Sequence, residues 1–236
     1  MKLKIKGDII PDADKWIYDF FDIDGVCPKD VETAIDQCAD GEDLDVEISS
    51  GGGDVIAGSE IYSALSGYKK GALTIRVTGL AASAASVIAM AGRCEMARTA
   101  LMMIHNTSTV ASGDYRDMEH AAEVLRAANE AIRSAYKAKT GHTDEELAEM
   151  MDRETWIPAD KAVELGFADG IMNEGTAPLA VAASFGTSLS AGALEKLRDK
   201  IEAIRNAETN KTDNGSDANA RAEADYKFLM LKGAQK

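Results

Sequence analysis

The 236-residue sequence has few prolines, few cysteines, few histidines and no long apolar run. With only 4 prolines and 45% hydrophobic residues, the chain can bury one sizeable core. The 3 cysteines are an odd number at no metal-ligand spacing, so we expect reduced thiols in apolar space and no catalytic role. No apolar run approaches the length of a membrane span, and the opening MKLKIKGDII alternates like a strand rather than a signal peptide. We therefore expect a cytoplasmic protein.

Positive charge is also scarce. The chain has 26 Lys and Arg against 40 Asp and Glu, which gives a formal net charge of −14. Such a surface repels phosphate backbones and anionic lipid headgroups. We therefore expect neither a nucleic-acid nor a membrane partner.

Strand-like and helix-like patterns alternate along most of the chain, which predicts an α/β fold with a largely parallel sheet. We expect strands at 2–10, 44–48, 72–77, 94–97 and 100–104, and helices at 28–39, 54–66, 80–92 and 117–139. A capping box at Thr143 and Glu146 predicts a further helix, and Gly166 ends a short one. The long helix at 117–139 projects from the core. We place one domain at 1–174 and a small-residue-rich, polar tail, disordered in part, at 175–236.

The segment SSGGGDVIAG, residues 49–58, joins the strand at 44–48 to a helix. Residues without Cβ allow a sharp turn and present bare backbone N–H groups to an anion. The segment matches neither a P-loop nor a dinucleotide-binding motif. On its own, the segment is explained as well by a tight turn with no ligand as by an anion-binding loop.

One serine and one histidine stand out as candidates for nucleophilic catalysis. Ser83 follows the strand at 72–77 near a helix start, whereas Ser86, one turn later, is better explained by packing. Of the 3 histidines, His120 and His142 are expected to be solvated, but His105 ends the apolar run ALMMIH. Active sites of open α/β sheets collect at such strand ends. Each residue taken alone has a structural explanation.

Taken together, these features resemble the proteolytic subunit of the Clp protease and its phage relatives, the head-maturation proteases. The resemblance covers residues 1–172 and rests on four motifs in order: SSGGGDV, GLAAS with Ser83, MIH with His105, and AVELGFAD. It implies a spiral of strand–helix units, shared with the crotonases, with a projecting long helix. It also implies Ser83 as nucleophile, His105 as base, Gly52 and Ala84 as oxyanion donors, and no metal or cofactor.

The third member of the triad departs from the family pattern. The family's aspartate falls on Glu154 in DRETW, and Asp152 is the alternative acid two residues earlier. Trp156 favours Glu154, because the family has an aromatic residue two positions after its acid. The loop also lacks the family's usual proline, and the chain starts at its first strand, which leaves docking to an unfoldase ATPase open.

The resemblance predicts a serine endopeptidase, ATP-independent or ATPase-assisted, that acts on proteins or peptides as a homo-oligomer of stacked rings. The expected role is phage head maturation, with scaffold or capsid protein as substrate in the host cytoplasm or the prohead. A bacterial cytoplasmic Clp proteolytic subunit is the alternative. Two other classes stay open, namely a crotonase-like acyl-CoA enzyme, which uses no serine nucleophile, and an assembly protein that has lost hydrolysis.

Overall fold

The computed structural model describes residues 1–172. The expected tail at 175–236 lies outside the described residues. Within the described part, no helix combines the length and the apolar character needed to cross a membrane.

Within residues 1–172 the strands form one sheet in the order β2-β1-β3-β4-β5-β8; β6 also pairs with β4, and β7 pairs with β6. Every pair is parallel except β6–β7, which is antiparallel. The expected largely parallel sheet is therefore confirmed. The strands are β1 (Lys2–Ile9), β2 (Gly25–Val26), β3 (Leu44–Gly53), β4 (Leu73–Ala82), β5 (Arg93–Met96), β6 (Leu101–Ile104), β7 (Thr155–Pro158) and β8 (Gly170–Ile171).

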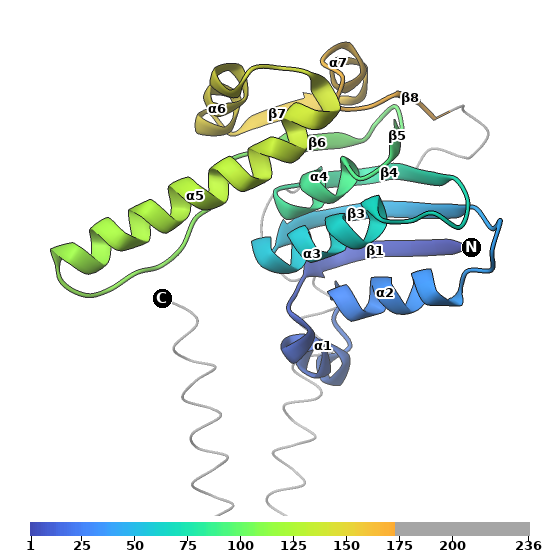
Figure 1. Ribbon diagram of the computed structural model, residues 1–236, viewed down its shortest axis with the longest axis horizontal. Helices are drawn as coiled ribbons and strands as arrows, with labels where there is room; N and C mark the ends of the chain where they lie inside the picture. The colour runs from blue at the N-terminus through green and yellow to red at the C-terminus, as the bar shows by residue number, and fades with distance from the viewer. Residues whose placement is uncertain (173–236) are drawn as a thin grey trace, which may run out of the picture. The chain divides into compact units, whose positions relative to one another are not determined.

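Helices α2, α3 and α4 lie side by side on one face of this sheet, and the long helix α5 runs beyond its edge (Figure 1). Every second side chain of β3 points toward the helices and is fully buried, as the two-residue period of a strand requires. These residues are Leu44, Val46 and Ile48. The helices are α1 (Lys15–Phe21), preceded by a 3-10 turn (Asp12–Asp14), α2 (Pro28–Gln37), α3 (Val55–Ser66), α4 (Ala84–Ala89), α5 (Tyr115–Thr140), α6 (Asp144–Asp152) and α7 (Ala159–Glu164).

One predicted helix, residues 80–92, is wrong in its first part. Leu80–Ala82 continue β4 and pair with Leu101–Met103 of β6, so that only Ala84–Ala89 are helical. The first half of β4 pairs instead with β5. An uncharged run is compatible with a buried strand or a buried helix, so periodicity alone does not separate the two. The correction places Ser83 at the junction of strand and helix.

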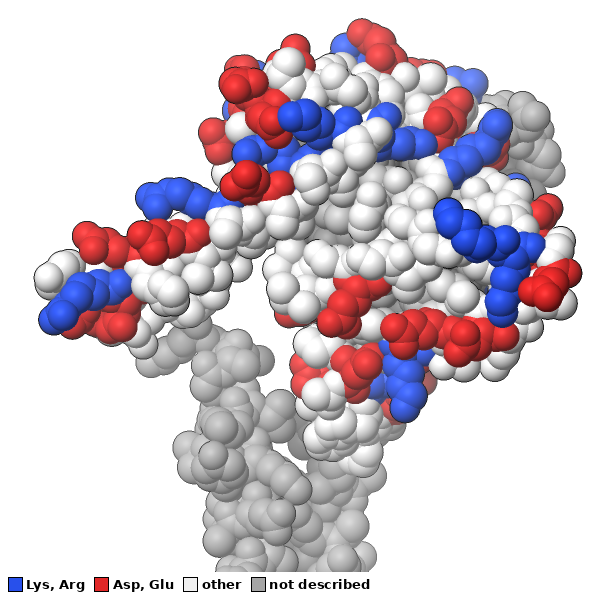
Figure 2. Space-filling view, in the orientation of Figure 1, with Lys and Arg blue, Asp and Glu red and all other residues white. Residues whose placement is uncertain are grey.

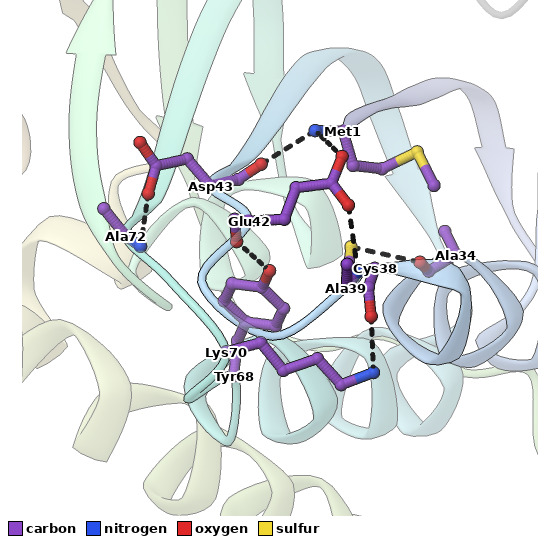
Figure 3. Close-up of polar contacts among 9 residues, drawn as sticks. All are labelled: Met1, Ala34, Cys38, Ala39, Glu42, Asp43, Tyr68, Lys70 and Ala72. Atoms are coloured by element: carbon purple, nitrogen blue, oxygen red, sulfur yellow. Dashed lines mark hydrogen bonds and ion pairs between the residues drawn. The ribbon is translucent and has the colours of Figure 1, made fainter.

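A network of polar contacts holds the amino-terminal end of the sheet (Figure 3). The Met1 amine pairs with the Glu42 carboxylate at 2.8 Å, and the Tyr68 hydroxyl donates to the Glu42 carbonyl. The Lys70 ammonium donates to the Ile35, Asp36 and Cys38 carbonyls at 3.0, 3.2 and 2.9 Å, which satisfies groups left unpaired at the end of α2. This network lies where β1, β3 and β4 begin. The candidate site lies where β3 and β4 end.

Candidate active site

Ser83 occupies a strained turn between β4 and α4. Its backbone has φ 54° and ψ −127°, outside the regions that non-glycine residues ordinarily adopt, at a cost of about 1–3 kcal/mol. The Ser83 N–H donates to the Met103 carbonyl at 3.0 Å, which ties the turn to β6. The turn therefore holds the Ser83 hydroxyl at the end of the sheet.

His105 directly follows β6, the neighbour of β4, and its side chain reaches Ser83. The Nε2 atom of His105 lies 2.8 Å from Oγ of Ser83, and both residues are half-buried. This separation is within hydrogen-bonding range for a base and its nucleophile. Residues 22 positions apart are brought together because β4 and β6 are adjacent and parallel.

The glycine segment approaches the backbone of two neighbours. A Cβ on Gly52, at φ +96°, would lie 2.6 Å from the Ala82 carbonyl oxygen and 2.7 Å from Cβ of Ser83. A Cβ on Gly53, at φ +146°, would lie 2.1 Å from the Ile9 carbonyl oxygen. Gly51 has nothing within 4 Å of the corresponding position. Two of the three glycines are therefore required by close packing of β3 against β1 and the Ser83 turn.

The two expected oxyanion donors have different surroundings. Ala84 is the first residue of α4, so its N–H has no acceptor within the helix. The Gly52 N–H, in contrast, donates to Oγ of the buried Ser50 at 3.1 Å, and that hydroxyl donates to the Gly7 carbonyl at 2.6 Å. Ser50 was missed by the sequence reasoning. It holds the Gly52 N–H in this structure.

Neither candidate acid is placed against His105. Glu154 is exposed, has φ 50°, and accepts a hydrogen bond from the Trp156 indole N–H at 3.2 Å. Asp152 accepts from the Asn106 side-chain amide at 2.7 Å. Within residues 1–172 no hydrogen bond or ion pair joins either carboxylate to the imidazole. The structure brings Ser83 and His105 together and leaves the acid apart.

Two buried hydroxyl groups, those of Ser86 and Tyr136, connect to the backbone carbonyl of the nucleophile. Oγ of Ser86 lies 2.6 Å from the Ser83 carbonyl oxygen, to which it donates, and 2.8 Å from the Tyr136 hydroxyl. Both residues are fully buried, and desolvation raises the pKa of Tyr136 well above its ordinary value, opposed by the Ser86 bond. Because Ser86 has a single hydroxyl proton and donates it to the Ser83 carbonyl, the Tyr136 hydroxyl donates to Ser86. The sequence reasoning assigned Ser86 to packing alone.

A cleft of about 580 Å³ begins at Ser83 and His105 and runs along α5. The cleft is lined on one side by the start of α3 and on the other by residues 107–111 and an apolar stripe of α5. Figure 2 shows charged side chains along the outer side of α5 and uncharged surface on the side that faces α3. The stripe comprises Ala121, Val124, Leu125, Ala128 and Ile132. An extended apolar cleft beside a serine–histidine pair suits a peptide segment.

Within residues 1–172, the remaining ionisable groups form no second catalytic or metal-binding site. His142 lies 3.2 Å from Glu146 and packs near the Phe167 ring, and it is half-buried rather than solvated as expected. His120 is exposed on α5. Among residues 1–172, no three His, Cys, Asp or Glu side chains are grouped so that they could hold a metal ion.

Comparison with known proteins identifies the family. The family model for Clp protease matches residues 33–175. The ATP-dependent Clp protease proteolytic subunit 1 of Chlamydia trachomatis serovar D is 35% identical over 138 residues, which are 56% of this chain and 71% of the relative. The corresponding subunit of Porphyromonas gingivalis is 34% identical over 145 residues, 59% of this chain and 64% of the relative.

A solved structure supports the fold. A point mutant of ClpP1 from Listeria monocytogenes superposes with a TM-score of 0.60 at 21% identity, covering 74% of this chain and 92% of that one. The chain therefore belongs to the Clp protease family, and its fold is that of ClpP. Membership of this family implies peptidase activity.

Proposed function

We propose that the protein is a serine endopeptidase in which Ser83 is the nucleophile and His105 the general base. The observation that carries this proposal is the 2.8 Å separation of Nε2 of His105 and Oγ of Ser83 in the strained turn. Nε2 takes the proton from Oγ as Oγ attacks a peptide carbonyl, and later returns a proton to the leaving amine. A water molecule, deprotonated by the same Nε2 atom, then attacks and hydrolyses the acyl-enzyme.

The negative oxygen of the tetrahedral intermediate needs preorganised donors. We assign the Ala84 N–H to this role together with the Gly52 N–H, which has to exchange its bond to Ser50 for one to the substrate. Gly52 is buried against the Ser83 turn, so its position supports the assignment although its hydrogen bond is engaged.

We assign the third triad position to Glu154, with Asp152 as the alternative. Either side chain has to leave its present partner, Trp156 or Asn106, to accept the Nδ1–H of His105. Both carboxylates are exposed, so each loses only a weak solvent-facing contact when it moves. The Glu154 assignment rests on its position in DRETW.

The serine–histidine contact distinguishes this function from the other classes. A crotonase-like acyl-CoA enzyme holds an enolate with two N–H groups and uses no serine nucleophile, so it gives no reason for a histidine at hydrogen-bonding distance from Ser83. An assembly protein without hydrolysis would equally not need the strained turn. Both features support an active hydrolase.

The biological role is a narrower proposal. The relatives reported above are bacterial Clp proteolytic subunits, so a bacterial Clp-type subunit fits at least as well as the phage head-maturation protease expected from the sequence. We propose that either role uses a homo-oligomer, with rings stacked through α5, acting on protein substrates. Degradation of a folded substrate with and without a Clp ATPase and ATP separates an ATPase-assisted subunit from an independent processing protease.

Hydrolysis of unfolded casein tests the catalytic proposal. Ser83→Ala and His105→Ala should abolish measurable cleavage, because they remove the nucleophile and the base, whereas Ser134→Ala, an exposed change on α5, should cleave at the wild-type rate. Circular dichroism checks that each variant is folded. Undiminished cleavage by folded Ser83→Ala would refute the assignment.

A further inference from the structure

The general base is the first residue of the connection between β6 and α5, residues 105–114. β6 itself is fixed by pairing with β4 and β7. Beyond the connection's first residues the side chains are exposed, and Val110 is 99% exposed. Strand pairing therefore restrains His105 only from its amino-terminal side. A second restraint is needed between His105 and the exposed part of the connection.

Asn129 of α5 provides such a contact. Its Oδ1 atom accepts from the Thr107 backbone N–H at 2.7 Å and lies 2.8 Å from Oγ1 of Thr107. Because a backbone N–H can only donate, the atom that faces it is the carbonyl oxygen of the Asn129 amide. Thr107 and Asn129 are both half-buried, so these bonds are partly shielded from water. Together with a weak contact from Oγ1 to the Leu125 carbonyl at 3.4 Å, they attach Thr107 to α5.

The attachment lies two residues from the base. With two soft backbone dihedrals per residue, the intervening Asn106 leaves His105 little freedom once Thr107 is fixed. Asn106 has its own bond to Asp152 at 2.7 Å, but that bond is exposed and contributes little restraint. Asn129 is therefore the better protected of the two restraints.

We propose that Asn129 is a positioning residue, which holds Nε2 of His105 at hydrogen-bonding distance from Ser83 by accepting hydrogen bonds from the backbone N–H and the hydroxyl of Thr107. The inference rests on the proposed function, since it concerns the reactivity of Ser83. It also assigns α5 a part in organising the site, in addition to lining the cleft. A displaced base costs rate because general-base catalysis depends on sub-ångström placement.

The test is the rate at which a fluorophosphonate–rhodamine probe labels Ser83 in the full-length protein. Asn129→Leu removes the acceptor and should slow labelling roughly 10-fold or more. Asn129→Asp keeps an acceptor oxygen in the same place and should label within about 3-fold of the wild type, because both Thr107 donors remain satisfied. Glu130→Leu, an exposed change at the next position, is the control and should label like the wild type.

A milder variant covers the case in which Asn129→Leu does not fold. Thr107→Val loses the hydroxyl contact and keeps the backbone bond, so its labelling rate should fall between those of the wild type and a variant without the acceptor. Hydrogen–deuterium exchange of the 104–110 peptide should rise in Asn129→Leu and not in Asn129→Asp, whatever the catalytic activity.

The outcomes separate the two proposals. Normal labelling of the wild type together with equally fast labelling of folded Asn129→Leu, or of Thr107→Val if Asn129→Leu is unfolded, overturns the positioning role alone. If Asn129→Asp is labelled as slowly as Asn129→Leu, the positioning role is also overturned, because an acceptor oxygen at position 129 would then not be what places His105. A folded wild type that is not labelled at Ser83 overturns the proposed function, and the positioning role with it.

Discussion

At the scale of single residues, the site depends on a few groups whose geometry is unusual for their type. Ser83 and Glu154 are two of the residues with positive φ, and Gly52 lies against the Ser83 turn where no other residue fits. Strain of this kind persists only when neighbouring contacts hold it in place. At Ser83 those contacts are the Met103 carbonyl and the hydroxyl of Ser86.

The identity of the triad acid is decided by one pair of substitutions. Glu154→Gln should lower kcat by roughly 10²-fold or more with little change in KM, because the imidazole loses the carboxylate that orients it. Asp152→Asn should stay within a few fold of the wild type, since the amide oxygen can still accept from Asn106. Steady-state kinetics on one peptide substrate measures both. The reverse pattern would assign the acid to Asp152.

The buried hydroxyl chain makes a stability prediction. Ser86→Ala leaves the Tyr136 hydroxyl buried without an acceptor and should cost about 1–3 kcal/mol of the free energy of unfolding. Adding Tyr136→Phe removes that unpaired group, so the double variant should be no less stable than Ser86→Ala. Urea denaturation of the double-mutant cycle measures the coupling. Additive losses would mean that the two hydroxyls do not interact.

At the scale of elements, β3, β4 and β6 end together and place the glycine segment, Ser83 and His105 side by side. The motifs predicted from the sequence that Ser83 and His105 belong to one site, and the structure places them in contact. The alternation of patterns predicted the parallel sheet. The elements α1, β2 and β7 were not predicted, because α1 has no buried residue that would mark an apolar face and β2 and β7 are too short to show alternation.

The supports of the site were not predictable for a related reason. The supporting side chains act through contacts with residues at least two positions and up to 50 positions away in the chain. They are Ser50, Ser86, Asn129 and Tyr136. The Ser86 hydroxyl in an uncharged run was the one available signal. Without the fold, this signal does not show that Tyr136 is its partner. The acid could not be placed either, since a carboxylate's position in sequence does not determine which side chain it contacts.

The glycine segment gives a prediction at this scale. Gly53→Ala should destabilise the protein by several kcal/mol, at least roughly 3, because its Cβ would overlap the Ile9 carbonyl oxygen at a positive φ. Gly51→Ala, two positions earlier with open space around it, should change stability by less than about 1 kcal/mol. Thermal melts compare the two. Equal losses would contradict the packing of β3 against β1.

At the scale of the whole molecule, α5 links the cleft to a surface that we expect to be an interface. Ala121, Val124 and Leu125 of the apolar stripe line the cleft, yet Val124 is 53% exposed, and Tyr115 and Met118 on the same helix are 69% and 39% exposed. Exposed apolar groups of this size on a projecting helix favour contact with another copy of the chain. The interface and the cleft therefore share one helix.

Light scattering after size exclusion tests this expectation. The wild type should elute as an assembly several times larger than the 25.1 kDa chain. The double variant Met118→Lys and Val124→Lys should form smaller species while keeping its far-ultraviolet circular dichroism, because charge on the apolar surface opposes burial. A monodisperse wild-type monomer at micromolar concentration would contradict assembly through α5.

The most direct test of the central claim is mass spectrometry of the purified protein after reaction with a fluorophosphonate. We predict one adduct per chain, located on the peptide that contains Ser83, absent from Ser83→Ala and formed much more slowly in His105→Ala. An adduct on another residue, or a folded protein that forms none, would contradict the conclusion that Ser83 and His105 are the catalytic pair.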